Sequence, residues 1–268
     1  RGYIHLAFGG HGGSSSLGDN QRGAAGKGKQ THVVSKRPLD ITEWEFLDNI
    51  SPFGTYSQWV KMDNGDLYLF FRHGSHQSDW VYQKSTDDGR TFTPPISVLK
   101  SKPHTGYEGP HDAWYAWFAE GLDNTITASY VYHLCDKSGR GKHTPARYNC
   151  YYMMMNTKDG SWQNIQGEAL AIPVTKESAD EETRILNTNK ERANRGTCRV
   201  DENGHPHLFF RHVDGHVRYI RWLGNDWQEP VVIIPGSKSQ DGDIVIDSPM
   251  DVRLLLRYKD AGVSTVGY

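Results

Sequence analysis

One short sequence frame, a turn followed by an alternating apolar segment that ends in Arg, recurs along this chain of 268 residues. It reads GDLYLFFR at residues 65–72 and GHPHLFFR at residues 204–211. Weaker copies occupy residues 2–9 (GYIHLAFG), 125–132 (TITASYVY) and 250–257 (MDVRLLLR). Period-2 alternation after an Asn-Gly turn is typical of antiparallel strands joined in meanders. A unit of about 45–60 residues with three or four such strands is typical of a propeller blade.

We therefore expect an all-β fold, a β-propeller with about five blades visible in this chain. A β-sandwich also has many short strands, but it does not repeat one strand five times in the same frame. A helical pattern has support only at residues 179–193, which we interpret as an excursion between two repeats. Residues 1–268 are expected to form one catalytic propeller domain, either a closed five-bladed ring or part of a larger ring that is truncated at one or both ends.

A second recurring motif supports the propeller. Residues 85–92 (STDDGRTF) fit the Asp-box, a hairpin turn between the outer two strands of propeller blades, and residues 156–162 (NTKDGSW) are a degraded copy. In such a turn the Ser and Asp side chains hold the backbone, Gly supplies a positive φ, and the aromatic residue packs beneath. We interpret both motifs as structural.

Charge and hydropathy exclude two classes of partner. The net charge is −2 and the isoelectric point is near 6.7, whereas a protein that binds nucleic-acid backbones needs a strong basic excess. The apolar runs at residues 231–235 and 252–256 are too short for a membrane span. Residue 1 is Arg and no apolar segment follows, so we expect the signal peptide of a secreted or periplasmic protein to lie outside this chain.

The ends of the repeated strands carry Arg and His. The last position of the frame holds Arg72, Arg211 and Arg257, and the next position holds His73, His133 and His212. Because equivalent residues of successive blades point to the same end of the channel, these side chains predict an anion site at its mouth. The structural alternative is that each Arg caps a strand and pairs with a carboxylate of its own blade.

The chain is rich in aromatic residues, with 8 Trp, 14 Tyr and 9 Phe. Residues 111–117 (HDAWYAW) and 148–152 (YNCYY) are dense in rings that can stack on sugar faces. Most of these rings are expected to pack in the core, because propeller sheets contact one another through large side chains.

Three segments resemble a known family. Residues 54–59 (GTYSQW), 63–67 (DNGDL) and 71–75 (FRHGS) resemble the core motifs of the BNR-repeat proteins. The opening residues 3–12 (YIHLAFGGHG) are similar to a further segment of that family. Within it, the chain looks most like the propeller-type ulvan lyases, which are secreted seven-bladed enzymes that cleave a sulfated algal polysaccharide by β-elimination next to a uronic acid.

The resemblance implies catalytic roles for His11, Tyr56 and Arg72, and substrate contact for Tyr115. We also assign substrate binding to His73 and Arg211, which follow from the repeat. Two positions depart from the family pattern, because Ser57 stands in place of Pro and Gly10 in place of Asp. The chain is shorter than a seven-bladed ring requires, so further blades are expected outside it.

The chemistry of β-elimination suits these residue types. A guanidinium such as that of Arg72 can neutralise the uronate carboxylate, so that the C5 proton becomes easier to remove. Either His11 or an ionised Tyr56 could take that proton, and the Tyr56 phenol could protonate the leaving glycosidic oxygen. The resulting hypothesis is a lyase that needs no cofactor for catalysis and acts as a monomer on an acidic polysaccharide.

Two other functions stay open. A sialidase-type hydrolase uses three Arg residues around a carboxylate, and Arg72, Arg211 and Arg257 could form that set, but no convincing Tyr and Glu pair accompanies them. A glycan-binding propeller without catalytic activity is the third possibility. A lyase differs from a hydrolase in creating an unsaturated uronate that absorbs in the near-ultraviolet.

The odd number of cysteines allows several arrangements. Cys135, Cys150 and Cys198 together with His143 could form a closed tetrahedral site for a structural Zn²⁺, with His133 and His212 as rival fourth ligands. A disulfide between Cys135 and Cys150 is the alternative for a secreted protein, and unpaired thiols in the core are a third possibility.

Overall fold

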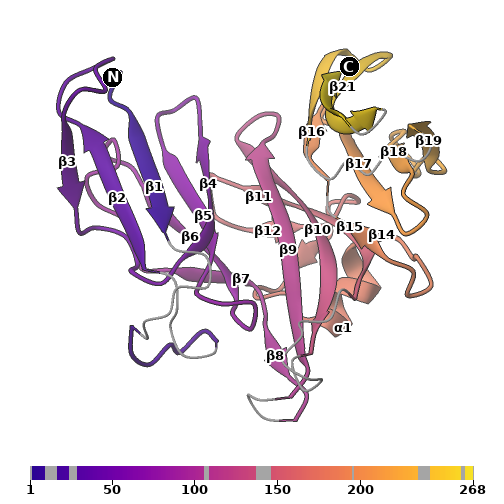
Figure 1. Cartoon of the computed structure of the whole chain (residues 1–268), viewed down its shortest axis with the longest axis horizontal. Helices are drawn as coiled ribbons and strands as arrows, with labels where there is room; N and C mark the ends of the chain where they lie inside the picture. Colours follow the sequence, from indigo (N-terminus) through magenta and orange to yellow (C-terminus); the bar gives the residue numbers. More distant parts are fainter. Residues whose placement is uncertain are drawn as a thin grey trace. The chain divides into compact units, whose positions relative to one another are not determined.

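The computed structural model is almost entirely β-structure and describes residues 2–9, 17–23, 29–105, 109–136, 146–194, 196–234, 242–260 and 263–267 (Figure 1). The chain forms two compact units. Unit 1 comprises Arg1–Ala113, Cys135–Lys142 and Ile172–Thr175, and unit 2 comprises Trp114–Leu134, His143–Ala171 and Lys176–Tyr268. The helices of the described residues are α1 (Lys176–Ser178) and the π-helix η1 (Ala179–Thr183). Neither is long and apolar enough to cross a membrane.

Unit 1 contains two antiparallel meanders. The first consists of β1 (His5–Gly9), β2 (Gln30–Ser35) and β3 (Trp44–Leu47). The second consists of β4 (Thr55–Lys61), β5 (Leu67–Arg72), β6 (Trp80–Ser85) and β7 (Ile96–Leu99). Leu69, Phe71 and Val81 of the second sheet are fully buried, and Ala7 of β1 packs against them. The apolar side of the alternation therefore forms the core of this unit.

A seven-stranded sheet has β8, the start of β9 and the last residue of β10 in unit 1, and the rest of its residues in unit 2. Its strands are β8 (Lys102–Pro103), β9 (His111–Glu120), β10 (Thr125–Cys135), β11 (Arg147–Asn156), β12 (Trp162–Gln163), β13 (Ala169–Leu170) and β14 (Arg184–Leu186). The rings of Trp114, Tyr130 and Tyr151 are packed edge to face or stacked in its interior, as expected for most of the aromatic residues.

Unit 2 contains two more antiparallel sheets. One consists of β15 (Ala193–Asn194), β16 (Cys198–Val200), β17 (Pro206–His212), β18 (Val217–Arg221) and β19 (Val231–Ile234). The other consists of β20 (Gly242–Ser248), β21 (Asp251–Asp260) and β22 (Val263–Gly267). Phe209 and Val217 of the first pack against Ile244 and Leu256 of the second, so the two sheets share one apolar core.

The five copies of the sequence frame fall on β1, β5, β10, β17 and β21, and each of these strands belongs to a different sheet. This confirms the predicted antiparallel meanders and the all-β class. The segment predicted as an excursion contains η1, followed by the short strands β14 and β15. Period-2 alternation and turn residues are local signals, which explains why the strands and turns could be predicted from the sequence.

The Asp-box prediction is also confirmed. Residues 85–92 form the turn between β6 and β7, the outer two strands of their sheet. Asp87 accepts hydrogen bonds from the Ser85 hydroxyl at 2.8 Å and from the Thr91 backbone at 2.9 Å and hydroxyl at 2.7 Å. These bonds, those from Thr91 first, lower the pKa of Asp87 to about 2. Gly89 has a φ of +76°, and the Phe92 ring packs against the core of unit 1.

Candidate active site

Tyr56 and Arg72 lie together in unit 1, as the sequence predicted. Arg72 ends β5 and is directly opposite Thr55 of β4 and Trp80 of β6. Its guanidinium carbon lies 4.7 Å from the centroid of the Tyr56 ring, and the Trp80 ring is stacked on the Tyr56 ring with the two centroids 6.3 Å apart. The pair thus combines a fixed positive charge with a phenol, two of the groups that β-elimination uses.

A β-bulge places Tyr56 in this position. The pairing of β4 with β5 shifts between Thr55 and Gln58, so the intervening residues are inserted opposite a continuous strand. Tyr56 itself has a φ of +60°, a left-handed conformation that costs an L-residue about 1–2 kcal/mol. Bulges and strained residues of this kind occur preferentially at functional sites, because they redirect one side chain out of the regular alternation.

Neighbouring hydrogen bonds hold the bulge. The Thr55 hydroxyl donates to the Gly74 carbonyl at 2.8 Å, and the Ser57 hydroxyl donates to the Gln30 side-chain oxygen at 2.5 Å. Gln30 in turn donates to the Ser51 carbonyl at 3.2 Å. A Cβ added at Gly54 would lie 2.3 Å from the Gln30 side chain, so only glycine leaves room for this contact. Ser57, the departure from the family pattern, therefore has its own structural role as a donor to Gln30.

Arg72 is deeply buried, with 1% of its surface exposed, whereas Tyr56 is half-buried. Burial keeps the guanidinium in surroundings of low dielectric, where its charge acts more strongly than in water. Because Tyr56 stacks over the guanidinium, a carboxylate from solvent reaches Arg72 only when a covering side chain moves. Tyr56 is thus both a candidate acid or base and part of the cover over Arg72.

His73 occupies a different environment from the one predicted. It is 4% exposed, its Nδ1 donates to Asn20 Oδ1 at 2.8 Å, and its Nε2 accepts from the Ser51 hydroxyl at 3.1 Å. Burial, followed by the charge of Arg22, lowers the pKa of His73 to about 4. Both ring nitrogens are used within unit 1, and this geometry favours a structural role; direct substrate binding by His73 stays a prediction.

His11 and the neighbouring Gly10 lie outside the described residues, so the role assigned to His11 stays a prediction. The same holds for His143 of the proposed zinc site.

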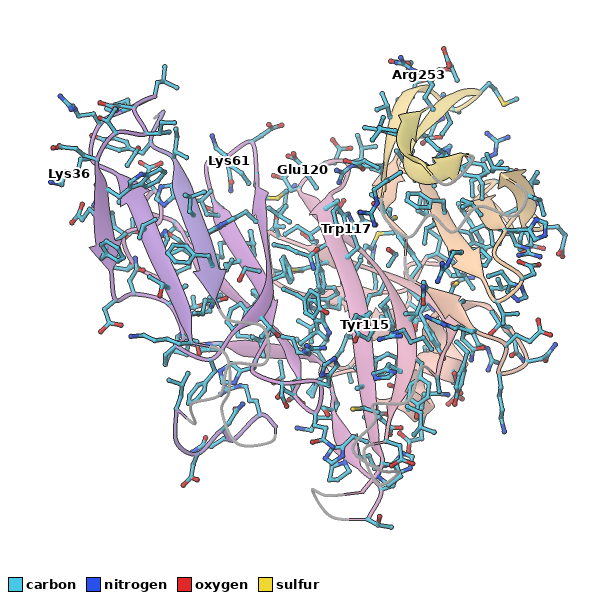
Figure 2. All side chains as sticks on the ribbon, viewed as in Figure 1. Lys36, Lys61, Tyr115, Trp117, Glu120 and Arg253 are labelled. Carbon is cyan, nitrogen blue, oxygen red and sulfur yellow. The ribbon has the colours of Figure 1, made fainter. Side chains whose placement is uncertain are left out.

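Tyr115 lies on β9 of unit 2, where it is labelled in Figure 2. Its hydroxyl accepts a hydrogen bond from Arg147 Nη2 at 2.9 Å, and the Arg147 guanidinium carbon lies 4.5 Å from the centroid of the Tyr115 ring. The His133 ring lies 5.4 Å from that of Tyr115, and His133 is directly opposite Arg147 in the pairing of β10 with β11. Unit 2 therefore has its own arginine and tyrosine pair, of which the sequence analysis identified only the tyrosine.

Arg211 lies on β17 and lines a pocket of about 300 Å³ in unit 2 together with Arg192 and Asn194. Burial and the charge of Arg192 lower the pKa of Arg211. Arg257, the third strand-end arginine, lies on β21 with an exposed side chain. Arg192 was missed because it falls in the segment that was interpreted as an excursion.

A larger pocket of about 600 Å³, also in unit 2, has acidic side chains in its lining, whereas the pocket at Arg211 has basic ones. The acidic side chains are those of Glu168, Glu181 and Glu182. Because their carboxylates repel anions, this pocket is a poor candidate for an acidic polysaccharide.

The three cysteines are free thiols and all are buried, so the structure contains no Cys135–Cys150 disulfide. Burial raises the pKa of both Cys150 and Cys198 to about 12. The Cys198 sulfur lies 3.4 Å from the Thr127 hydroxyl. Within the described ranges, no three Cys, His, Asp or Glu side chains are grouped as ligands of a metal.

The two rival histidine ligands have other partners. His133 Nδ1 lies 2.8 Å from the Ala146 carbonyl, and His212 lies between the carboxylates of Glu191 at 3.0 Å and Asp214 at 3.4 Å. Buried thiols of high pKa do not by themselves favour a metal, although Zn²⁺ would deprotonate them on binding.

Comparison with known proteins places this geometry in context. The chain is 46% identical to the ulvan lyase of Alteromonas sp. (strain LOR), over all of this chain and 58% of that protein. It is 45% identical to the "Ulvan Lyase-PL25" of Pseudoalteromonas sp. (strain PLSV), over 96% of this chain and 55% of that protein.

Among solved structures, the chain is similar to a PL25 ulvan lyase with a TM-score of 0.91 and 44% identity, over 99% of this chain and 63% of that one. A second structure, described as that lyase bound to -[GlcA(1-4)Rha3S]-, matches with the same values. The chain thus spans less than two thirds of the length of these relatives. The BNR repeat-containing family matches residues 1–232, and the chain therefore belongs to this family.

Proposed function

We propose that this chain is part of a polysaccharide lyase that cleaves ulvan by β-elimination. The observation that carries the proposal is the Tyr56 and Arg72 pair, formed by a strained bulge over a buried guanidinium. The similarity to proteins named ulvan lyases supports this activity over the sialidase-type hydrolase and the glycan-binding propeller. The ligand of the related PL25 structure suggests glucuronic acid linked to 3-sulfated rhamnose as the repeating substrate unit.

In the proposed reaction, Arg72 binds the uronate carboxylate and neutralises its charge. This lets the electron pair of the C5–H bond be drawn toward the carboxylate when the base removes the proton. The C4–O bond then breaks, a double bond forms between C4 and C5, and an acid protonates the leaving oxygen. Tyr56 adjoins Arg72 and serves as that acid, while His11 or Tyr56 serves as the base.

The positive charge of Arg72 supports both steps. It attracts negative charge at this point of the site, whether on the uronate or on a tyrosinate. The low dielectric around a guanidinium that is 1% exposed strengthens this attraction. Movement of the Tyr56 ring away from Arg72 would admit the carboxylate and carry the phenol toward the sugar.

Further parts of the proposal concern the whole protein. We propose that the five sheets are blades of a propeller, with the remaining blades supplied by sequence outside this chain. We also propose a secreted or periplasmic monomer, with Cys135, His143, Cys150 and Cys198 as ligands of a structural Zn²⁺ and no cofactor in the reaction.

Substitution of Arg72 tests the proposed mechanism. Arg72→Ala should lower kcat on ulvan by roughly 10²–10³-fold, the effect of losing one group that stabilises charge in the transition state. Arg72→Lys should recover little of this, because an ammonium lacks the bidentate geometry. Arg90→Lys is the matched control, since Arg90 contacts the Tyr3 ring at 5.9 Å on the exposed surface. Near-normal turnover in Arg72→Ala would rule out the role of Arg72 in neutralising the carboxylate.

A further inference from the structure

Gln30 of β2 joins the two ends of the segment that carries the bulge. Its Nε2 donates to the Ser51 carbonyl at 3.2 Å, and its Oε1 accepts a hydrogen bond from the Ser57 hydroxyl at 2.5 Å. The backbone N–H of Gln30 also donates to the Pro52 carbonyl at 2.8 Å. One residue of the first sheet of unit 1 therefore holds both ends of residues 51–57, which lead into β4 of the second sheet.

The fold leaves room for the Gln30 side chain and buries it. Gln30 is 4% exposed and is directly opposite Gly9 in the pairing of β1 with β2. A Cβ added at Gly54 would collide with the amide group of Gln30. A buried amide is costly unless its donor and its acceptor are both used, and the segment of the bulge uses both. The position therefore requires a side chain that donates and accepts at once.

The Ser51 end of this link is fixed independently of Gln30. The Ser51 backbone N–H donates to Gln83 Oε1 of β6 at 2.7 Å, and the Ser51 hydroxyl donates to His73 Nε2 at 3.1 Å. Both partners belong to the second sheet of unit 1 or directly follow one of its strands. A side chain that binds Ser51 and Ser57 together therefore fixes the bulge relative to that sheet.

The conformation of Tyr56 needs such a restraint. A φ of +60° is unfavourable for a tyrosine and persists only where the surroundings determine it. The residue before it is restrained by the hydrogen bond from the Thr55 hydroxyl to the Gly74 carbonyl at 2.8 Å, and the residue after it by the bond from Ser57 to Gln30. Loss of the second bond would let Tyr56 relax to an ordinary strand conformation.

We propose that Gln30 is a positioning residue, which keeps Tyr56 in its strained conformation and thereby places the phenol beside Arg72 for proton transfer. This rests on the proposed function, since Tyr56 is then the catalytic acid or base. Gln30 acts through Ser57 and not through a contact with the reacting atoms. Its loss should lower the fraction of enzyme that has Tyr56 in place, which lowers kcat, and should leave the carboxylate contact of Arg72, which preserves KM.

Substitution at either end of the hydrogen bond tests the proposal on ulvan with the full chain. Gln30→Ala should lower kcat by about 5–30-fold, which is the cost of a left-handed residue, about 1–2 kcal/mol, at about 1.4 kcal/mol per tenfold. KM should change by less than about twofold. Ser57→Ala removes the same bond at a less buried position and should give the same result, even where Gln30→Ala does not fold. Ser57→Thr keeps the hydroxyl and should retain kcat.

A double variant and a control separate positioning from general stability. Gln30→Ala combined with Ser57→Ala should lower kcat no more than the larger single effect, because both remove one contact. Asn164→Ala is the matched control, since Asn164 is a buried amide of unit 2 that donates to the Glu182 carbonyl and accepts from the Gln166 backbone, both at 3.1 Å. It should lower Tm and leave kcat unchanged. Parental kcat in both single variants, or single effects that multiply, would overturn the proposal.

Failure of the proposed function gives a different result. If the parent releases no unsaturated uronate from ulvan, the lyase assignment fails, and crystal structures of the parent and of Ser57→Ala then test the positioning alone. In the parent, Tyr56 should keep its positive φ and its contact with the Arg72 guanidinium. In Ser57→Ala, the φ of Tyr56 should become negative and its ring should leave the guanidinium. An unchanged Tyr56 in this variant would overturn the positioning role of Gln30.

Discussion

Tyr56→Phe separates the chemical role of Tyr56 from its structural one. Phenylalanine keeps the ring that lies 4.7 Å from the Arg72 guanidinium carbon and 6.3 Å from the Trp80 ring, and loses only the hydroxyl. Because the ring contacts are kept, the free energy of unfolding should fall by no more than about 1.5 kcal/mol, the contribution of one hydrogen bond. If the hydroxyl transfers the proton, kcat should fall by roughly 10²–10⁴-fold, which is about 3–5.5 kcal/mol of transition-state stabilisation.

Tyr56→Ala should lower the stability of the protein as well as its turnover. It removes a cation–π contact to a buried guanidinium, worth about 2 kcal/mol, and a ring stack worth about 0.5–1.5 kcal/mol. Stability should fall by about 2–4 kcal/mol, whereas kcat should fall no less than in Tyr56→Phe. Chemical denaturation and the rise of near-ultraviolet absorbance on ulvan measure the two quantities.

Tyr3→Phe is the matched control for the hydroxyl. The Tyr3 ring also lies beside an arginine, with the Arg90 guanidinium carbon at 5.9 Å, but Tyr3 is 41% exposed. Its turnover should equal that of the wild type. Wild-type turnover in Tyr56→Phe would refute the acid–base role of Tyr56, and loss of folding in Tyr56→Phe would refute the claim that the ring alone is structural.

Two further predictions concern pH and metal. The pKa of His73 in the folded protein is about 4 and that of a free histidine is 6.5, so the unfolded chain binds more protons between these values. Stability should be highest above pH 6.5 and fall as the pH drops toward 4, by at most about 3 kcal/mol for this group. In His73→Gln the Tm should depend less steeply on pH, and an unchanged dependence of Tm on pH would contradict the burial argument. The proposed zinc site predicts about one Zn²⁺ per chain by metal analysis and a lower Tm after chelation, whereas less than about half an equivalent would exclude it.

The sequence predicted the strands well where the signal is local. The alternation in residues 65–72 and 204–211 became β5 and β17, and the Asp-box at residues 85–92 became the turn after β6. In each case neighbouring residues determine the outcome, through the two-residue period of a strand and the hydrogen bonds of a turn.

The site was predicted less completely because it depends on contacts between distant residues. The residues next to Tyr56 in the sequence do not predict its φ of +60°, because the bulge is stabilised by hydrogen bonds to Gln30 and Gly74, which are not its neighbours in the sequence. His73 has the same position in the frame as an active-site group would, but Asn20 and Ser51 enclose it.

The two additional arginines show the same limitation. Arg147 is adjacent to His133 only through the pairing of β10 with β11, and Arg192 approaches Arg211 only through the pairing of β15 with β17. A basic residue next to a predicted strand was the available signal, and it becomes informative only when the strand's partner is known.

The most direct test of the proposed lyase is the absorbance of its products. The full chain should act on ulvan to produce a steady rise in near-ultraviolet absorbance, in step with new reducing ends, because β-elimination creates an unsaturated uronate at each cleavage. Arg72→Ala should slow both signals together. New reducing ends without absorbance would show hydrolysis instead, and ulvan binding with neither signal would show that the chain binds the glycan without cleaving it.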